Sequence, residues 1–125
     1  LLSRDDYMVG SDAIPLGSLP HPRAYGCFPR FIGRLRRTFN IISLEQMVQR
    51  MTQNPAVRFG LTKRGVIKED YYADIVIFDA EHVIDNATYD DPIQFPTGIP
   101  YVIVNGQVAV DNEVCTGVLA GQAVP

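Results

Sequence analysis

Apolar and polar positions divide the chain into a first part with helical spacing and a second part with strand spacing. A short apolar run at Tyr7–Val9 ends in Gly10-Ser11-Asp12, which predicts a buried strand with polar groups at its carboxyl end. Residues 13–29 are rich in proline and glycine, so we expect them to form a loop. The chain is therefore predicted to open with one strand and a long loop.

Two helices are predicted after this loop. From Pro29 to Phe39, large apolar residues recur at spacings of three and four, while arginines take another face. A second helix begins at Ser43, because Ser43-Leu44-Glu45-Gln46 matches a capping box that satisfies two exposed backbone donors. A further short helical turn is predicted from the cap Asn54-Pro55 through Arg58, with Gly60 closing it. The apolar faces of the two helices are Phe28, Phe31, Ile32, Leu35 and Phe39 in the first, and Leu44, Met47, Val48 and Met51 in the second.

The spacing of apolar residues becomes strand-like beyond Gly65. Ala73–Asp79 is rich in β-branched residues and predicts a strand. Tyr101–Val104 and Gln107–Val110 flank Asn105-Gly106, which predicts a hairpin because both turn positions require positive φ. We therefore expect residues 1–60 to form an α/β part and residues 61–125 to form a block of β-strands.

Composition excludes several classes of protein. The chain has 125 residues, of which 46% are hydrophobic and 20% charged, as in a soluble globular protein. Its apolar runs are too short to cross a membrane. Cys27 and Cys115 lack a CxxC partner, so we expect no disulfide framework or structural zinc site and a reducing, cytoplasmic setting. Leu1 is neither an initiator Met nor part of a secretory signal, so we expect the chain to begin inside a longer protein.

Charge is distributed unevenly along the chain. All 11 Lys and Arg lie at or before Lys68, whereas most of the 14 Asp and Glu follow it. Our main interpretation is that the two segments face each other or belong to different parts of a larger protein. The alternative is a surface for anions or nucleic acid on Arg30, Arg34, Arg36 and Arg37. No nucleic-acid-binding motif accompanies these arginines, so we do not expect a nucleic-acid partner.

An ordered series of short motifs covers nearly the whole chain. It begins with Met8–Asp12, His21-Pro22-Arg23, Phe28-Pro29-Arg30 and Met51–Ala56. It continues with Phe59-Gly60-Leu61, Arg64–Ile67, Tyr72–Asp79 and Tyr101–Gly106. In this order the motifs resemble the C-terminal part of N-acyl-D-amino-acid deacylases, which are members of the amidohydrolase superfamily. The chain departs from the common pattern of that family at Ala13 and Asp70, where glycine is usual.

The resemblance implies a fold and an activity. The fold would be the C-terminal end of a TIM-type (β/α) barrel followed by the closing strands of a small β-sandwich. The activity would be zinc-dependent cleavage of linear amide (C–N) bonds, with N-acyl-D-amino acids as the small-molecule substrates. Asp12 matches the aspartate that deprotonates the metal-bound water and passes the proton to the leaving nitrogen, and Arg23 matches the arginine that grips the substrate carboxylate. Both side chains suit these tasks, because a carboxylate at the end of a barrel strand can act as a general base and a guanidinium forms a bidentate fork.

The family's main metal ligands are absent from this sequence. The family uses an HxH pair, two later histidines and a bridging Cys, carboxylated Lys or Glu, whereas the histidines here are His21 and His82. Asp12 is the one candidate metal contact, to a second metal or to the bound water. We therefore expect a fragment that is inactive alone and that self-associates or binds the N-terminal part of a longer protein.

Other interpretations of individual residues remain open. His21 is interpreted as loop scaffolding, His82 as a solvated side chain, and both cysteines as core or incidental residues. A nucleophilic triad of Ser11, His21 and an aspartate would lack the usual GxSxG elbow. The alternative function, from another class, is a non-catalytic β-rich interaction or oligomerisation module.

Overall fold

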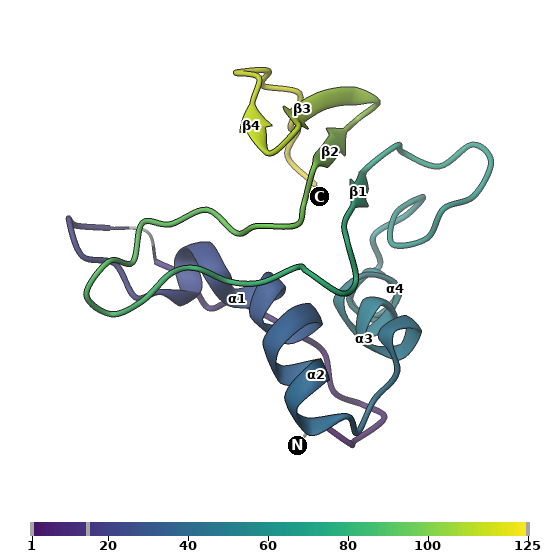
Figure 1. Cartoon of the computed structure of the whole chain (residues 1–125). Helices are drawn as coiled ribbons and strands as arrows, with labels where there is room; N and C mark the ends of the chain where they lie inside the picture. Colours follow the sequence, from purple (N-terminus) through teal and green to yellow (C-terminus); the bar gives the residue numbers. More distant parts are fainter. Residues whose placement is uncertain (1, 15, 125) are drawn as a thin grey trace.

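Helices occupy the first part of the chain and a single sheet the second. The computed structural model describes residues 2–14 and 16–124. The helical elements are α1 (Arg23–Arg30), η1 (Phe31–Leu35), α2 (Arg36–Phe39), α3 (Leu44–Met51) and α4 (Gln53–Arg58). The strands are β1 (Ile75–Ile77), β2 (Tyr101–Val104), β3 (Gln107–Asp111) and β4 (Val114–Cys115). Figure 1 shows the sheet beside the helices, with the long connection between β1 and β2 running along α1 and back. Within the described ranges, no helix has the length and apolar character needed to cross a membrane.

The strand predicted at Tyr7–Val9 is not formed. These residues carry no regular secondary structure, and the Val9 N–H donates to the carbonyl oxygen of Arg50 at 3.3 Å. A strand requires a ladder to a neighbouring strand, and none of the strands in the described part of the chain lies beside this segment. The predicted burial is confirmed for Val9, which packs with Ile42 and Met47 in the hydrophobic core.

The first helix begins at Arg23, well before the predicted start at Pro29, so the predicted loop was wrong over its last part. Pro22 precedes the helix with φ −51°, and its fixed backbone angle suits a helix start. Pro29 lies inside α1, where it removes one backbone donor. The chain passes directly from α1 into the π-helical turn η1 and then into α2.

The face that this helical segment buries also differs from the prediction. Phe31 and Ile32 pack against the core, but Phe28 and Phe39 are exposed. The positions that are fully buried instead carry small residues at spacings of three and four, namely Pro22, Gly26, Pro29 and Gly33. A smooth helical face of this kind lets another backbone approach closely.

The second helix and its cap were predicted correctly. Ser43 Oγ accepts a bond from the Gln46 N–H at 3.2 Å, and Gln46 Oε1 accepts one from the Ser43 N–H at 3.1 Å. Met47 is completely buried, whereas the other apolar residues of α3 are half-buried. The short helix α4 begins earlier than expected, and Gly60 follows it with φ 68°.

The sheet is antiparallel throughout, with strand order β1-β2-β3-β4. Asn105 and Gly106 have φ values of 47° and 79°, which confirms the predicted hairpin turn. The strand predicted over Ala73–Asp79 is reduced to three residues, because only Ile75–Ile77 pair with β2. A second tight turn at Asn112-Glu113 leads to β4, which the sequence analysis did not predict. The chain thus forms helices followed by an open four-stranded sheet.

Candidate active site

Asp12 and Arg23 form an ion pair in the lining of a cavity of about 300 Å³. Asp12 has φ 47° and a side chain that is 86% exposed. Arg23 is the first residue of α1, and its Nη2 lies 3.3 Å from Asp12 Oδ2. The structure therefore brings together the two side chains to which the sequence assigned catalysis and substrate binding.

The wall of this cavity comes from two distant parts of the chain. One part comprises Gly10–Asp12 and residues between His21 and Phe31, and the other is the segment from Asp85 to Tyr89, which belongs to the connection between β1 and β2. No motif in the sequence predicted that the second segment belongs to the site. The one available signal was the acid at Asp85, which directly follows the apolar pair Val83-Ile84.

His21 lines the candidate site and forms hydrogen bonds through both ring nitrogens. Its Nδ1 accepts a bond from the Arg23 backbone N–H at 3.1 Å. Its Nε2 lies 3.1 Å from Tyr89 Oη, and the two rings meet edge to face at 5.2 Å. Both ring nitrogens are thus engaged, which leaves neither for a triad with Ser11.

Asp85 anchors the second segment to the helices. Its side chain is 1% exposed, and its two oxygens accept bonds from Arg30 Nε at 2.8 Å and Arg34 Nε at 3.1 Å. Both arginines remain half exposed. The interpretation that the basic and acidic parts of the chain face each other is confirmed at this contact.

Residues 80–89, which we call the strap, also bond to the helices through their backbone. Arg37 donates to the carbonyl oxygens of Val83 at 2.8 Å and Ala80 at 3.3 Å, and Arg36 donates to Ala80 at 3.0 Å. A Cβ at Gly33 would stand 2.1 Å from the Val83 oxygen, so glycine is needed for this close approach. Four arginines therefore hold the strap against the helices through hydrogen bonds, namely Arg30, Arg34, Arg36 and Arg37.

The remaining candidate nucleophiles and ligands differ in burial, since Cys27 is half-buried whereas Cys115 and His82 are exposed. Burial raises the pKa of the half-buried Cys27 thiol, which lowers its thiolate fraction. His82 is exposed as expected, and its hydrogen bond lowers the pKa of Asp79. Within residues 2–14 and 16–124, no three His, Cys, Asp or Glu side chains lie close enough together to hold a metal ion.

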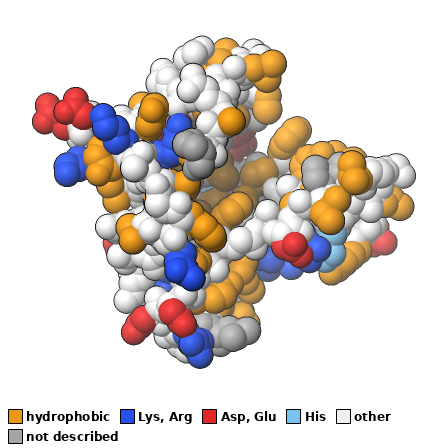
Figure 2. Space-filling view, turned by 180° about the vertical axis from the view of Figure 1, so that it is seen from behind, with side chains coloured by type: hydrophobic (Ala, Val, Ile, Leu, Met, Phe, Trp, Pro, Cys, Tyr) orange, Lys and Arg blue, Asp and Glu red, His pale blue; other side chains and the backbone are white. Residues whose placement is uncertain are grey.

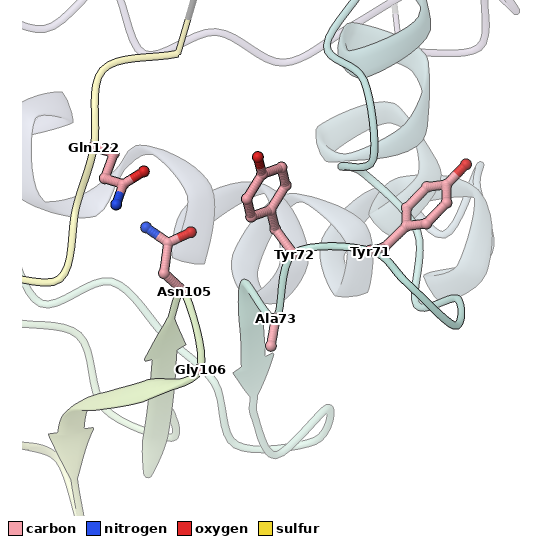
Figure 3. Close-up of a pocket in the computed structure, with 6 residues that line it drawn as sticks. All are labelled: Tyr71, Tyr72, Ala73, Asn105, Gly106 and Gln122. Atoms are coloured by element: carbon pink, nitrogen blue, oxygen red, sulfur yellow. The ribbon is translucent and has the colours of Figure 1, made fainter.

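A second cavity lies beside the β2–β3 hairpin. It has a volume of about 340 Å³ and is lined by Tyr71, Tyr72, Ala73, Asn105, Gly106 and Gln122. Figure 3 shows the side chains of Asn105 and Gln122 pointing toward one another at this site. Asn105 Nδ2 donates to the Ala120 carbonyl oxygen at 2.7 Å. The lining holds no carboxylate, imidazole or thiol, so it offers no acid, base or nucleophile of those types.

Comparison with known proteins gives a consistent result. The model of the amidohydrolase family matches residues 1–110. The chain is 41% identical over 117 residues to a D-aminoacylase of Alcaligenes xylosoxydans xylosoxydans, and 46% identical over 99 residues to an N-acyl-D-glutamate deacylase of the same organism. These matches cover 94% and 79% of this chain but 24% and 20% of the relatives.

Solved structures agree with this comparison. A crystal structure of D-aminoacylase superposes with a TM-score of 0.90 at 41% identity, covering 94% of this chain and 25% of that one. An N-acyl-D-glutamate deacylase from Bordetella bronchiseptica, complexed with zinc and a phosphonate inhibitor, superposes with a TM-score of 0.84 at 44% identity, covering 86% and 23%. The chain thus spans about a quarter of the length of these relatives. Because the family match extends over most of its residues, the chain belongs to the amidohydrolase family.

Proposed function

We propose that this chain is part of a zinc-dependent hydrolase that cleaves the amide bond of N-acyl-D-amino acids. The observation that carries the proposal is the pairing of Asp12 with Arg23 in the lining of one cavity. Relatives named D-aminoacylase, N-acyl-D-aspartate deacylase and N-acyl-D-glutamate deacylase support the substrate class. Their substrates share an amide to be cleaved and a carboxylate to be recognised.

Asp12 is proposed as the general base and acid of the reaction. Its exposed carboxylate can take a proton from the attacking water and return it to the amide nitrogen that leaves. This role requires an acceptor that lines the cavity, is accessible to water and is not buried in a structural ion pair. Asp12 meets that requirement, whereas Asp85 in the same cavity is held by two arginines.

Arg23 is proposed to bind the substrate carboxylate. A guanidinium offers two parallel N–H donors that match the two oxygens of a carboxylate. In the structure one of its nitrogens lies beside the Asp12 carboxylate. A substrate carboxylate that replaces Asp12 on Arg23 would bind there and at the same time release Asp12 to accept a proton.

We propose that this chain alone does not hold zinc. A zinc site needs three or four nitrogen, sulfur or oxygen ligands, and the described ranges contain no group of three such side chains. Asp12 is at most one contact to a metal or to its water. Structures of relatives contain zinc or a binuclear metal centre. We propose that the other ligands come from the part of the full-length protein that corresponds to the remaining length of the relatives.

We infer that the fold is a part of a larger one. Residues 1–60 are proposed to form the last strand, substrate loop and terminal helices of a (β/α) barrel, and residues 61–125 to form strands of a composite β-sandwich. On this view the Tyr7–Val9 segment pairs with a neighbouring barrel strand in the full-length protein. The superposition on D-aminoacylase supports this assignment.

Exposed apolar side chains support the same proposal. They occur on the strands, for example Val76, Ile77 and Val108, and on the helical part, for example Val57 and Phe59. Figure 2 shows apolar side chains gathered around a hollow on one face of the molecule. Large exposed apolar patches are typical of surfaces that another polypeptide covers. We propose that the rest of the full-length protein covers them, and that the isolated chain self-associates.

The proposed function is tested by an assay of the full-length protein that carries this chain. Zinc-loaded protein should release the D-amino acid from its N-acetyl derivative, while the L-enantiomer serves as the control substrate. Failure to cleave any N-acyl-D-amino acid, in a folded protein that contains zinc, would contradict the proposal.

A further inference from the structure

The contacts of His21 carry an inference about how Arg23 is held. His21 Nδ1 accepts from the Arg23 backbone N–H, so in the neutral ring the proton must lie on Nε2. That nitrogen then donates to Tyr89 Oη, which lies 3.1 Å away. The ring therefore bridges the first residue of α1 and the end of the strap.

The strap in turn is fixed to the helices independently of His21. The Asp85 carboxylate accepts hydrogen bonds from Arg30 and Arg34. The Val83 carbonyl oxygen, which lies close to Gly33, accepts a hydrogen bond from Arg37. Tyr89, four residues after Asp85, is thus attached to a firmly held segment. Its hydroxyl gives the His21 ring a defined partner at the edge of the cavity that Asp12 and Arg23 share.

We propose that His21 and Tyr89 are positioning residues that set the place of Arg23 for binding a substrate carboxylate. This inference rests on the proposed function of Arg23. His21 does not touch the reacting atoms but acts through the Arg23 backbone, whose placement determines where the guanidinium can reach. Tyr89 acts through His21, because its hydroxyl and ring edge hold the imidazole in one orientation.

Kinetics of the full-length protein test the proposal with two substrates, an N-acetyl-D-amino acid and its carboxamide, which lacks the charged group. His21→Ala should raise the KM of the first substrate by about tenfold or more, the scale expected when a hydrogen bond to a charged group is disturbed. The rate on the carboxamide should change less than about twofold. His21→Asn should recover most of the loss, because an asparagine can accept the N–H of the second residue after it. Tyr89→Phe should show a smaller rise in KM for the carboxylate substrate alone.

A matched control is His82→Asn, which changes an exposed histidine outside the cavity. This variant should leave the KM and the rate unchanged for both substrates. An equal loss on both substrates in His21→Ala, or an unchanged KM, would overturn the positioning role. An inactive wild-type protein would instead contradict the proposed function. In that case ¹⁵N NMR of the histidine-labelled protein still decides the inference, with the His21 signal assigned by its loss in His21→Asn. A ring protonated on Nε2 and unprotonated on Nδ1 is expected, and the opposite tautomer would overturn the proposal.

Discussion

Arg30 and Asp85 are separated by 55 residues in the sequence, yet Arg30 Nε lies 2.8 Å from Asp85 Oδ2. Arg34 completes the same site from the next helical turn, at 3.1 Å from Asp85 Oδ1. This contact joins the basic helical part to the acidic second part of the chain. It also forms a wall of the cavity that contains Asp12 and Arg23.

The Asp85 contact predicts a loss of stability when its charge is removed. Asp85→Asn should lower the free energy of unfolding by about 2 kcal/mol, since charged hydrogen bonds are lost from a buried position. This loss of stability should be smaller than the loss of about 3–5 kcal/mol expected when a fully buried ion pair is broken. The reason is that both arginines remain half exposed and hydrated. Urea unfolding of the wild type and of Asp85→Asn measures the change in the free energy of unfolding. Asp6→Asn is the control, because Asp6 and Arg4 form an exposed pair, and its unfolding midpoint should not move.

Gly33 predicts a steric effect at the strap. Gly33→Ala should lower the free energy of unfolding by about 1–3 kcal/mol, because the new Cβ and the Val83 oxygen must move apart. The control is Gly121→Ala, since a Cβ at that position would meet nothing within 4 Å. Thermal unfolding of both variants checks the expectation. Equal stability of Gly33→Ala and wild type would show that the strap does not approach the helix this closely.

Asp12 is expected to affect turnover rather than folding. In the full-length protein, Asp12→Asn should lower kcat by about a hundredfold or more, the usual contribution of general acid–base catalysis. The melting temperature should change little, because the ion pair that Asp12 forms with Arg23 is exposed. Steady-state kinetics and thermal melts on the same preparation measure both quantities. Near-normal turnover would remove Asp12 from the mechanism.

Arg23 is expected to affect the binding of carboxylate substrates. Arg23→Lys keeps the charge but loses the bidentate fork, so binding should weaken by about 1.5–3 kcal/mol for an N-acyl-D-amino acid. The matching carboxamide should be affected much less. Comparison of KM and kcat for the two substrates checks this. If both substrates suffer equally, Arg23 does not recognise the carboxylate.

Metal content distinguishes the isolated chain from the full-length protein. After dialysis, the 125-residue chain should retain no tightly bound zinc and should not cleave an N-acyl-D-amino acid, because the described part of it offers no three-ligand group. Sedimentation should show self-association through its exposed apolar residues. Metal analysis of the full-length protein, dialysed in parallel, is the control. One equivalent of zinc in an active monomer of the isolated chain would contradict this prediction.

Local signals in the sequence were sufficient for the elements whose structure depends on neighbouring residues. The capping box at Ser43 and the turn at Asn105-Gly106 formed as predicted, because a side-chain cap and positive φ are properties of a few consecutive residues. The motif order also identified the family and indicated Asp12 and Arg23 as site residues. In the structure, Arg23 Nη2 lies 3.3 Å from Asp12 Oδ2.

Tertiary structure alone decided the features that depend on distant residues. Tyr7–Val9 has the apolar pattern of a strand but finds no strand partner in the described part of the chain, and pairing is not a local property. The helical segment around Pro29 buries its glycines and prolines most completely and leaves Phe28 and Phe39 exposed, and the strap approaches it at Gly26 and Gly33. The roles of Asp85 and His21 followed from contacts spanning 55 and 68 residues, which no local spacing could indicate. The sequence by itself therefore determined the helix cap, the hairpin turn and the candidate chemistry, and long-range packing determined which side chains share the cavity.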